Sequence, residues 1–246
     1  ENQPKVVQYY TELGQHQPLF EKYKAFQASP AFAQLSVAQR RIIDHAVRDF
    51  RLSGAELSAD QKTRFAEIQA ELARLSTRFS ENVLDATNAF SMLVEREEEL
   101  RGIPADVLEA FRSAAHKDGK SGWKISLQMP SYMPVMQYAE NRALREALYH
   151  AYATRAAEFG KAELDNTPLI RRILEMRSEE AALLGYANYA EVSLVPKMAQ
   201  TPRQVIDFLN DLTAKGLPYA KRDVVELTDF AARELGLSPL QSWDIA

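Results

Sequence analysis

Four histidines are the side chains of this 246-residue sequence with the best chemistry for binding a metal ion. They are His16, His45, His116 and His150, and cysteine is absent. A zinc site on a helix ordinarily shows two ligands three or four residues apart. No histidine has a second histidine at that spacing. His45 and Asp49 are four residues apart and can share a helix face, but a histidine with a carboxylate one turn on is common by chance, so we expect a structural role for His45. The sequence therefore predicts no metal site and no bound cofactor in this chain.

Nucleophilic and acid–base catalysis have no better support. The chain has no Gly-x-Ser-x-Gly motif and no glycine-rich phosphate loop, and it holds only 9 glycines. Glu95, Glu97, Glu98 and Glu99 form an acidic cluster. General acid–base catalysis needs separated carboxylates in different environments, whereas adjacent ones are typical of a solvated turn. We expect no catalytic residue among them.

Two arginines, Arg155 and Arg177, fall on apolar faces of predicted helices. A guanidinium group is costly to desolvate unless a carboxylate or several carbonyl groups meet it. The favoured hypothesis is that both are buried, paired and structural. The alternative is that one of them reaches a cleft and meets a peptide carboxylate or carbonyl. Their predicted neighbours are Leu144, Leu148 and Ala151 for Arg155, and Ile170, Leu174, Ala181 and Leu184 for Arg177.

Helical periodicity governs the elements that must position these residues. Ser58 and Gln61 have the spacing of a capping box, and apolar residues then recur every three or four positions without proline or glycine. This predicts one long helix, with a core-facing row of Phe65, Ile68, Leu72, Leu75, Phe79, Val83, Ala86, Phe90 and Leu93.

Further helices are predicted on both sides of the long one. The helix before it, at 30–52, is joined to it by Ser53-Gly54-Ala55, a link short enough for an antiparallel pair. The last helix should begin at the capping box Thr201–Gln204 and kink or break at Gly216 and Pro218. The other predicted helices span 4–13, 18–28, 104–116, 142–158, 167–184 and 187–196.

A small β element interrupts the helices. Trp123, Ile125, Leu127 and Met129 alternate with polar residues, which predicts a strand over 123–129. Its partner is expected near 92–98 or, alternatively, outside this chain. Two prolines in Pro130–Met136 predict a stiff turn from strand to helix; alternatively, that turn serves to place Tyr132 at an edge. The predicted fold class is mostly α: a multi-helical lobe of long antiparallel helices with this minor β element.

Composition limits the partners. The net charge is −4, and Lys and Arg are scattered rather than gathered into the basic stripe that nucleic-acid binding requires. No apolar run approaches the roughly 20 residues that span a bilayer. We expect neither nucleic-acid nor membrane binding. Without cysteine or a signal peptide, we expect a cytoplasmic location.

Several ordered phrases resemble the oligopeptidase A / thimet oligopeptidase family of zinc peptidases. The similarity is continuous from about Leu57 to Ala246. The phrases are Arg78–Thr87, Trp123–Met136, Asn141–Glu146, Ala151–Ala156, Leu184–Leu194 and Ser242-Trp-Asp-Ile-Ala246.

The resemblance implies a helical enzyme whose two lobes flank a deep channel that admits only short peptides. It also implies a zinc ion on an H-E-x-x-H helix, a motif that this chain lacks. Residues 1–246 are then the upstream helical portion, with initial helices over 1–56 and the long helix, small β element and helical remainder over 57–246. The implied partners are short peptide substrates and the remainder of the polypeptide, with zinc bound in the complete enzyme but not by this chain.

Two hypotheses of function remain open. In the first, the chain is the scaffold and channel wall of a zinc oligopeptidase. In the second, it is a non-catalytic, all-helical interaction module. The first predicts apolar faces that evolved to pack against further chain, around Trp243 and Ile245 and at Val205, Phe208, Leu209, Leu212 and Leu217.

Overall fold

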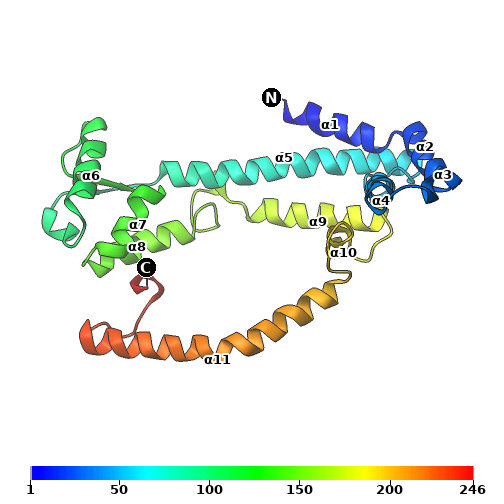
Figure 1. Ribbon diagram of the computed structural model, residues 1–246. Helices are drawn as coiled ribbons and strands as arrows, with labels where there is room; N and C mark the ends of the chain where they lie inside the picture. Colours follow the sequence, from blue (N-terminus) through cyan, green and yellow to red (C-terminus); the bar gives the residue numbers. More distant parts are fainter. Residues whose placement is uncertain (1, 246) are drawn as a thin grey trace. The chain divides into compact units, whose positions relative to one another are not determined.

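The computed structural model describes residues 2–245 and is mostly α-helical, as predicted (Figure 1). The chain divides into two compact units, one built from residues 2–78 and 168–213 and the other from residues 79–167 and 214–245. The predicted division near residue 56 stays a prediction about the polypeptide.

The first unit contains the amino-terminal helices and a helix pair. Its elements are α1 (Gln3–Gly14), α2 (Gln17–Gln27), α3 (Pro30–Ala33), α4 (Val37–Leu52), the first part of α5 (Ala59–Ala89), α9 (Thr167–Leu183), α10 (Tyr189–Leu194) and the start of α11 (Pro202–Glu234). The predicted Ser58–Gln61 capping box at the start of α5 is confirmed by hydrogen bonds of 3.1 and 3.4 Å. At α11, the Gln204 amide donates to Thr201 Oγ1, but the Gln204 side chain accepts from the Gln200 amide, so half of the predicted box forms.

Helices α5 and α9 lie side by side and antiparallel within this unit (Figure 1). Arg64 on α5 pairs with Glu179 at 2.6 Å, and Arg172 on α9 pairs with Glu71 at 2.7 Å. The two contacts are one heptad apart on both helices and in opposite order, which fixes the antiparallel register. The arginine hydrogen bonds hold the pKa of Glu71 and of Glu179 below the usual range.

The predicted helix over 30–52 is two helices. The second, α4, starts at a capping box in which Ser36 and Gln39 exchange hydrogen bonds, and this cap separates it from α3. The predicted antiparallel pairing with the long helix is also wrong, because α4 packs against α2 instead. Their shared core comprises Phe20, Val47 and Ala55, with Tyr23 and Phe50 against it.

The second unit surrounds the small sheet. It holds the end of α5, β1 (Ser91–Val94), η1 (Glu97–Leu100), α6 (Ala105–Lys117), β2 (Trp123–Ser126), α7 (Met129–Tyr138), α8 (Arg142–Ala153), η2 (Ala162–Leu164), the rest of α11 and η3 (Ser242–Asp244). The strands are antiparallel, with Met92 opposite Ile125, so the predicted partner is confirmed. Its core includes Leu100, Phe111, Ile125, Val135 and Leu148.

Pro130 begins a helix instead of ending a strand. The predicted strand stops at Ser126, and α7 starts three residues later, at Met129, with Pro130 in its first turn, where the missing amide hydrogen costs nothing. The Ser126 amide donates to Ser131 Oγ at 2.9 Å, which ties the strand end to the helix. The expected stiff turn at 130–136 is therefore wrong, and Tyr132 is buried rather than at an edge.

Two helix ends also differ from the prediction. Helix α8 ends at Ala153, five residues early, so Arg155 lies in the following loop. Helix α10 is shorter than the predicted 187–196. Helix α11 continues through Gly216 and Pro218 as one helix, so of the predicted kink or break, the break is wrong.

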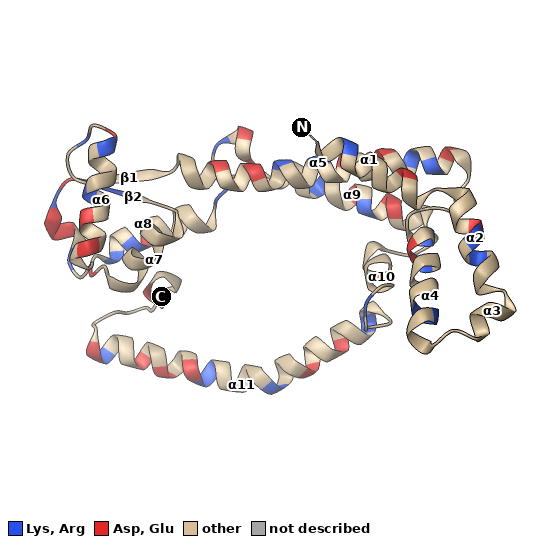
Figure 2. Ribbon diagram, turned by 45° about the horizontal axis from the view of Figure 1, so that its top comes forward, with Lys and Arg blue, Asp and Glu red and all other residues tan. Residues whose placement is uncertain are grey.

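Most apolar side chains of α11 are exposed in both units. Phe208, Leu209 and Leu212 are exposed in the first and Leu217 in the second, as predicted, whereas Val205 is half-buried. Ile245 is exposed, but Trp243 packs on its own unit's core, which corrects that part of the prediction. Basic and acidic residues are interspersed along α11 (Figure 2). Within residues 2–245 no helix has the length and apolar character to cross a bilayer.

Candidate functional site

His45 and the acidic cluster, for which the sequence predicts no catalytic role, lie on different elements. His45 is exposed on α4, and its neighbour Asp49 pairs with Arg48 at 2.7 Å. The acidic cluster forms a mostly exposed turn around η1, in which Glu99 pairs with Arg96. Within residues 2–245, no group of three or more His, Cys, Asp or Glu side chains lies close enough to hold a metal ion. The described side chains therefore do not fit a zinc site.

A pocket in the second unit is the candidate binding site. It lies between the end of α5, the residue after β2, the end of α8 and the loop that follows, and its volume is about 260 Å³. Pockets for drug-sized ligands measure about 300–1,000 Å³, so this pocket lies just below that range. Arg155, Lys161 and the hydroxyl of Thr154 are its polar groups, and the other lining side chains are apolar or glycine. The lining residues are Ala86, Ala89, Phe90, Leu127, Ala151, Thr154, Arg155, Ala156, Gly160, Lys161 and Leu164.

Arg155 is held in this pocket by neutral partners. Its Nε donates to the Tyr152 carbonyl at 2.9 Å, and Nη1 donates to Thr87 Oγ1, also at 2.9 Å. Its guanidinium carbon lies 3.6 Å from the centre of the Tyr152 ring, a close cation–π contact. Arg155 is half-buried in a loop, so the predicted burial on a helix face is wrong, but the predicted carbonyl partner is confirmed.

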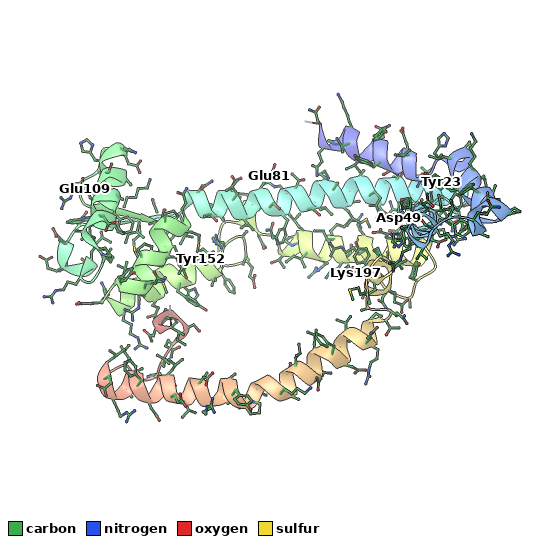
Figure 3. All side chains as sticks on the ribbon, viewed as in Figure 1. Tyr23, Asp49, Glu81, Glu109, Tyr152 and Lys197 are labelled. Atoms are coloured by element: carbon green, nitrogen blue, oxygen red, sulfur yellow. The ribbon has the colours of Figure 1, made fainter. Side chains whose placement is uncertain are left out.

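Tyr152 itself is fixed from the other elements of the unit. Its position near the end of α8 is labelled in Figure 3. Its ring stacks on Tyr132 of α7 with centroids 4.2 Å apart, and its hydroxyl contacts the Met129 sulfur at 3.6 Å. Burial, together with the neighbouring Tyr152 and Tyr149, raises the pKa of Tyr132, so it stays a neutral phenol. The aromatic pair therefore gives the guanidinium group a rigid, uncharged platform.

The loop after α8 is closed by two buried asparagines. Asn82 of α5 donates to Asn166 Oδ1 at 2.9 Å, and Asn166 Nδ2 donates to the Phe79 carbonyl at 3.0 Å. The Asn166 amide also donates to the carbonyl of Ala156, which has a left-handed backbone with φ of 51°. An alanine in that region costs about 1 kcal/mol, and the asparagine contacts hold it there.

Arg177 lies in the first unit and has a different environment. It is half-buried and stands 4.9 Å from the centre of the Tyr189 ring. Its predicted apolar face is wrong, because Ile170 and Leu174 are exposed. The buried group nearby is Glu180, whose pKa is raised by burial, an effect that Gln69 and Arg177 partly oppose.

A cluster of two arginines and one aspartate connects η3 to α8. The Asp244 side chain is fully buried and accepts from Arg142 and Arg145, each at 2.8 Å. Burial opposes ionisation of Asp244, but the hydrogen bonds from both arginines and from the Gln241 amide outweigh it and hold its pKa below the usual range. The Arg145 Nε also donates to the Trp243 carbonyl at 3.0 Å. Sequence reasoning missed this cluster, although Arg142, Arg145 and Asp244 all lie in phrases of the family resemblance.

Comparison with known proteins accounts for these phrases. The profile of the neurolysin/thimet oligopeptidase N-terminal domain matches residues 1–62, and that of peptidase family M3 matches residues 135–246. Oligopeptidase A of Haemophilus influenzae is 44% identical over 244 residues, which cover 98% of this chain and 36% of that protein. Oligopeptidase A of Escherichia coli is 42% identical over 99% of the chain and 36% of its own length.

The chain is therefore similar to a segment of the M3 peptidases. A plant relative, the probable cytosolic oligopeptidase A of Arabidopsis thaliana, is 41% identical over 254 residues and is likewise covered to 36%. The chain thus spans about a third of the length of the curated relatives it matches. The residues that the M3 profile matches include Arg155 and Lys161 of the pocket and the arginine cluster at Asp244, whereas Ala86, Ala89, Phe90 and Leu127 of the pocket lie before them.

Proposed function

We propose that this chain is the upstream part of a zinc-dependent oligopeptidase that hydrolyses short peptides. In this proposal, the described residues supply scaffold and peptide-contacting wall, and the catalytic zinc and its ligands belong to chain beyond them. The observation that carries it is identity above 40% to oligopeptidase A across nearly the whole chain, with M3-related profiles matching near both ends. A cytoplasmic location goes with it, supported by the cytosolic relative from Arabidopsis.

The geometry supports a division of labour between this segment and the rest. The described residues contain no candidate zinc-ligand group, whereas the Arg155 pocket has the size and polarity of a binding site. Binding energy gained far from the reacting bond contributes to catalysis by positioning the substrate. A segment without catalytic groups can therefore still affect the rate of peptide cleavage.

A comparison of two proteins tests the proposal: the chain as given and the complete reading frame of its gene. We expect the complete protein to bind one zinc ion per polypeptide and to cleave a quenched fluorescent peptide in a chelator-sensitive way. The chain alone should do neither. A complete reading frame that encodes no H-E-x-x-H helix, or stoichiometric zinc with cleavage by the chain alone, would refute the proposal.

The exposed side chains of α11 favour this reading over an interaction module. Phe208, Leu209, Leu212 and Leu217 are each about half exposed, and contiguous apolar surface of that kind is usually covered. The chain alone should therefore bind a hydrophobic dye or self-associate in sedimentation experiments across a concentration series. A dye-silent monomer with a sharp unfolding transition would instead support the self-contained module.

A further inference from the structure

The Arg155 pocket contains two positively charged side chains. Among the described residues, neither Arg155 nor Lys161 has a carboxylate partner, although both line the same pocket of about 260 Å³. Every other lining side chain except the hydroxyl of Thr154 is apolar or glycine. A guanidinium group beside apolar walls binds an anion strongly, because water competes poorly there.

The guanidinium group is also preorganised. Its Nε and Nη1 are used by the Tyr152 carbonyl and Thr87, and its face rests on the Tyr152 ring, which Tyr132 stacks against. These contacts fix the plane of the group and leave Nη2 without a protein acceptor among the described residues. An arginine held in this way loses little side-chain entropy when a ligand binds. The contacts that hold it are neutral, so its positive charge remains for the ligand.

We propose that this pocket binds the free C-terminal carboxylate of a peptide whose last side chain is apolar. The carboxylate accepts from Arg155 Nη2, Lys161 lies within the same pocket to add charge, and the side chain occupies the space between Ala86, Phe90 and Leu164. The volume limits the bound portion to about one residue, which excludes a long internal stretch of peptide. This inference deepens the proposed function and rests on it for the choice of a peptide as the ligand.

Calorimetric titration of the complete protein, freed of metal by chelation so that no probe is cleaved, tests the site. The probes are acetyl-Ala-Ala-Leu, the same tripeptide as its C-terminal amide, and 4-methylpentanoate, which has the carboxylate and alkyl group without the peptide. We expect the acid to bind at least tenfold more tightly than the amide, because a charge-assisted hydrogen bond is lost in the amide. 4-Methylpentanoate should bind more weakly than the tripeptide acid.

Variants of the two cations sharpen the test. Arg155→Gln should weaken binding of the acid about tenfold or more and leave the amide unchanged, whereas Arg155→Lys should restore part of the loss. Lys161→Ala should have a smaller effect. Arg203→Gln, which removes an exposed arginine of α11, is the matched control and should change nothing. A thermal melt of each variant confirms that it is folded.

The outcomes separate this inference from the proposed function. Equal affinity for acid and amide, or an Arg155→Gln protein that binds the acid normally, overturns the site even if the zinc-loaded protein cleaves peptides. Tighter binding of 4-methylpentanoate than of the tripeptide acid overturns the peptide assignment. Selective, Arg155-dependent binding of the acid by a protein that cleaves no peptide supports the site and refutes the proposed function.

Discussion

The two ends of helix α8 use arginine in opposite ways. At the first turn, Arg142 and Arg145 share the buried carboxylate of Asp244, which compensates one of their two positive charges within the protein. Beyond the last turn, Arg155 is oriented by a carbonyl, a hydroxyl and an aromatic ring, none of which carries a charge. The comparison teaches that partner type, rather than burial, separates an arginine that stabilises from one that is poised to bind.

The largest predicted effect is at the compensated end. Asp244→Asn should lower the free energy of unfolding by about 3 kcal/mol, because it leaves two guanidinium groups without their shared anion. Urea unfolding measures this. Asp207→Asn is the matched control, since Asp207 pairs with Arg203 on the exposed surface of α11 and should contribute less than about 1 kcal/mol. Equal losses for the two variants would contradict the assigned role of the cluster.

The Asp244 contribution should also depend on pH. Since its pKa is lower in the folded than in the unfolded state, the stabilisation is fully present above the ordinary value near 3.8 and is lost as the pH falls through the folded-state pKa. The difference between wild type and Asp244→Asn should therefore shrink below about pH 4. A difference that stays constant down to pH 2 would show that charge is not its source.

Arg177 gives an intermediate case. Had Arg177 been buried and paired, as the sequence predicted, its removal would cost about 3 kcal/mol. Because Arg177 is half-buried and its guanidinium group stands 4.9 Å from the centre of the Tyr189 ring, we expect Arg177→Met to cost about 1 kcal/mol in urea unfolding. Methionine keeps most of the packing, so the measurement isolates the charge. A loss of 3 kcal/mol or more would restore the original prediction.

The smallest predicted effect concerns the loop that carries Arg155. Ala156→Gly should raise the free energy of unfolding by about 0.5–1 kcal/mol, because glycine adopts the left-handed conformation without strain. Ala153→Gly, in the last turn of α8, is the control and should destabilise by a similar amount. If Ala156→Gly also destabilises, the strain assigned to this loop is absent.

Local sequence signals predicted much of this fold. The Ser58–Gln61 cap and the apolar period gave α5, and alternation at Trp123 and Ile125 gave a strand with its correct partner. The signals failed where a residue has two roles. Proline at position 130 can end a strand or start a helix, and only the helix lets Ser131 accept the Ser126 amide.

The candidate site was less predictable for a physical reason. Arg155 was singled out from the sequence, but on a helical face, because the period of α8 continues past the point where the chain leaves the helix. Tertiary contacts hold the chain after α8 in its non-helical path. Asn166 accepts from Asn82, 84 residues earlier in the sequence, and its amide donates to the Ala156 carbonyl. Two asparagines so far apart in the sequence give no local pattern. The stacking of Tyr132 on Tyr152 was also missed, because Tyr132 lies in a segment that was predicted to be a turn.

The central claim, that one end of α8 stabilises and the other binds, is tested most directly by a matched pair of variants. For Arg145→Met and Arg155→Met, both the free energy of unfolding and the affinity for acetyl-Ala-Ala-Leu are measured. Arg145→Met should cost about 2–3 kcal/mol of stability and leave the affinity of the folded protein unchanged. Arg155→Met should cost about 1 kcal/mol and weaken binding about tenfold. An Arg155→Met protein that loses as much stability as Arg145→Met, with its affinity intact, would contradict the account.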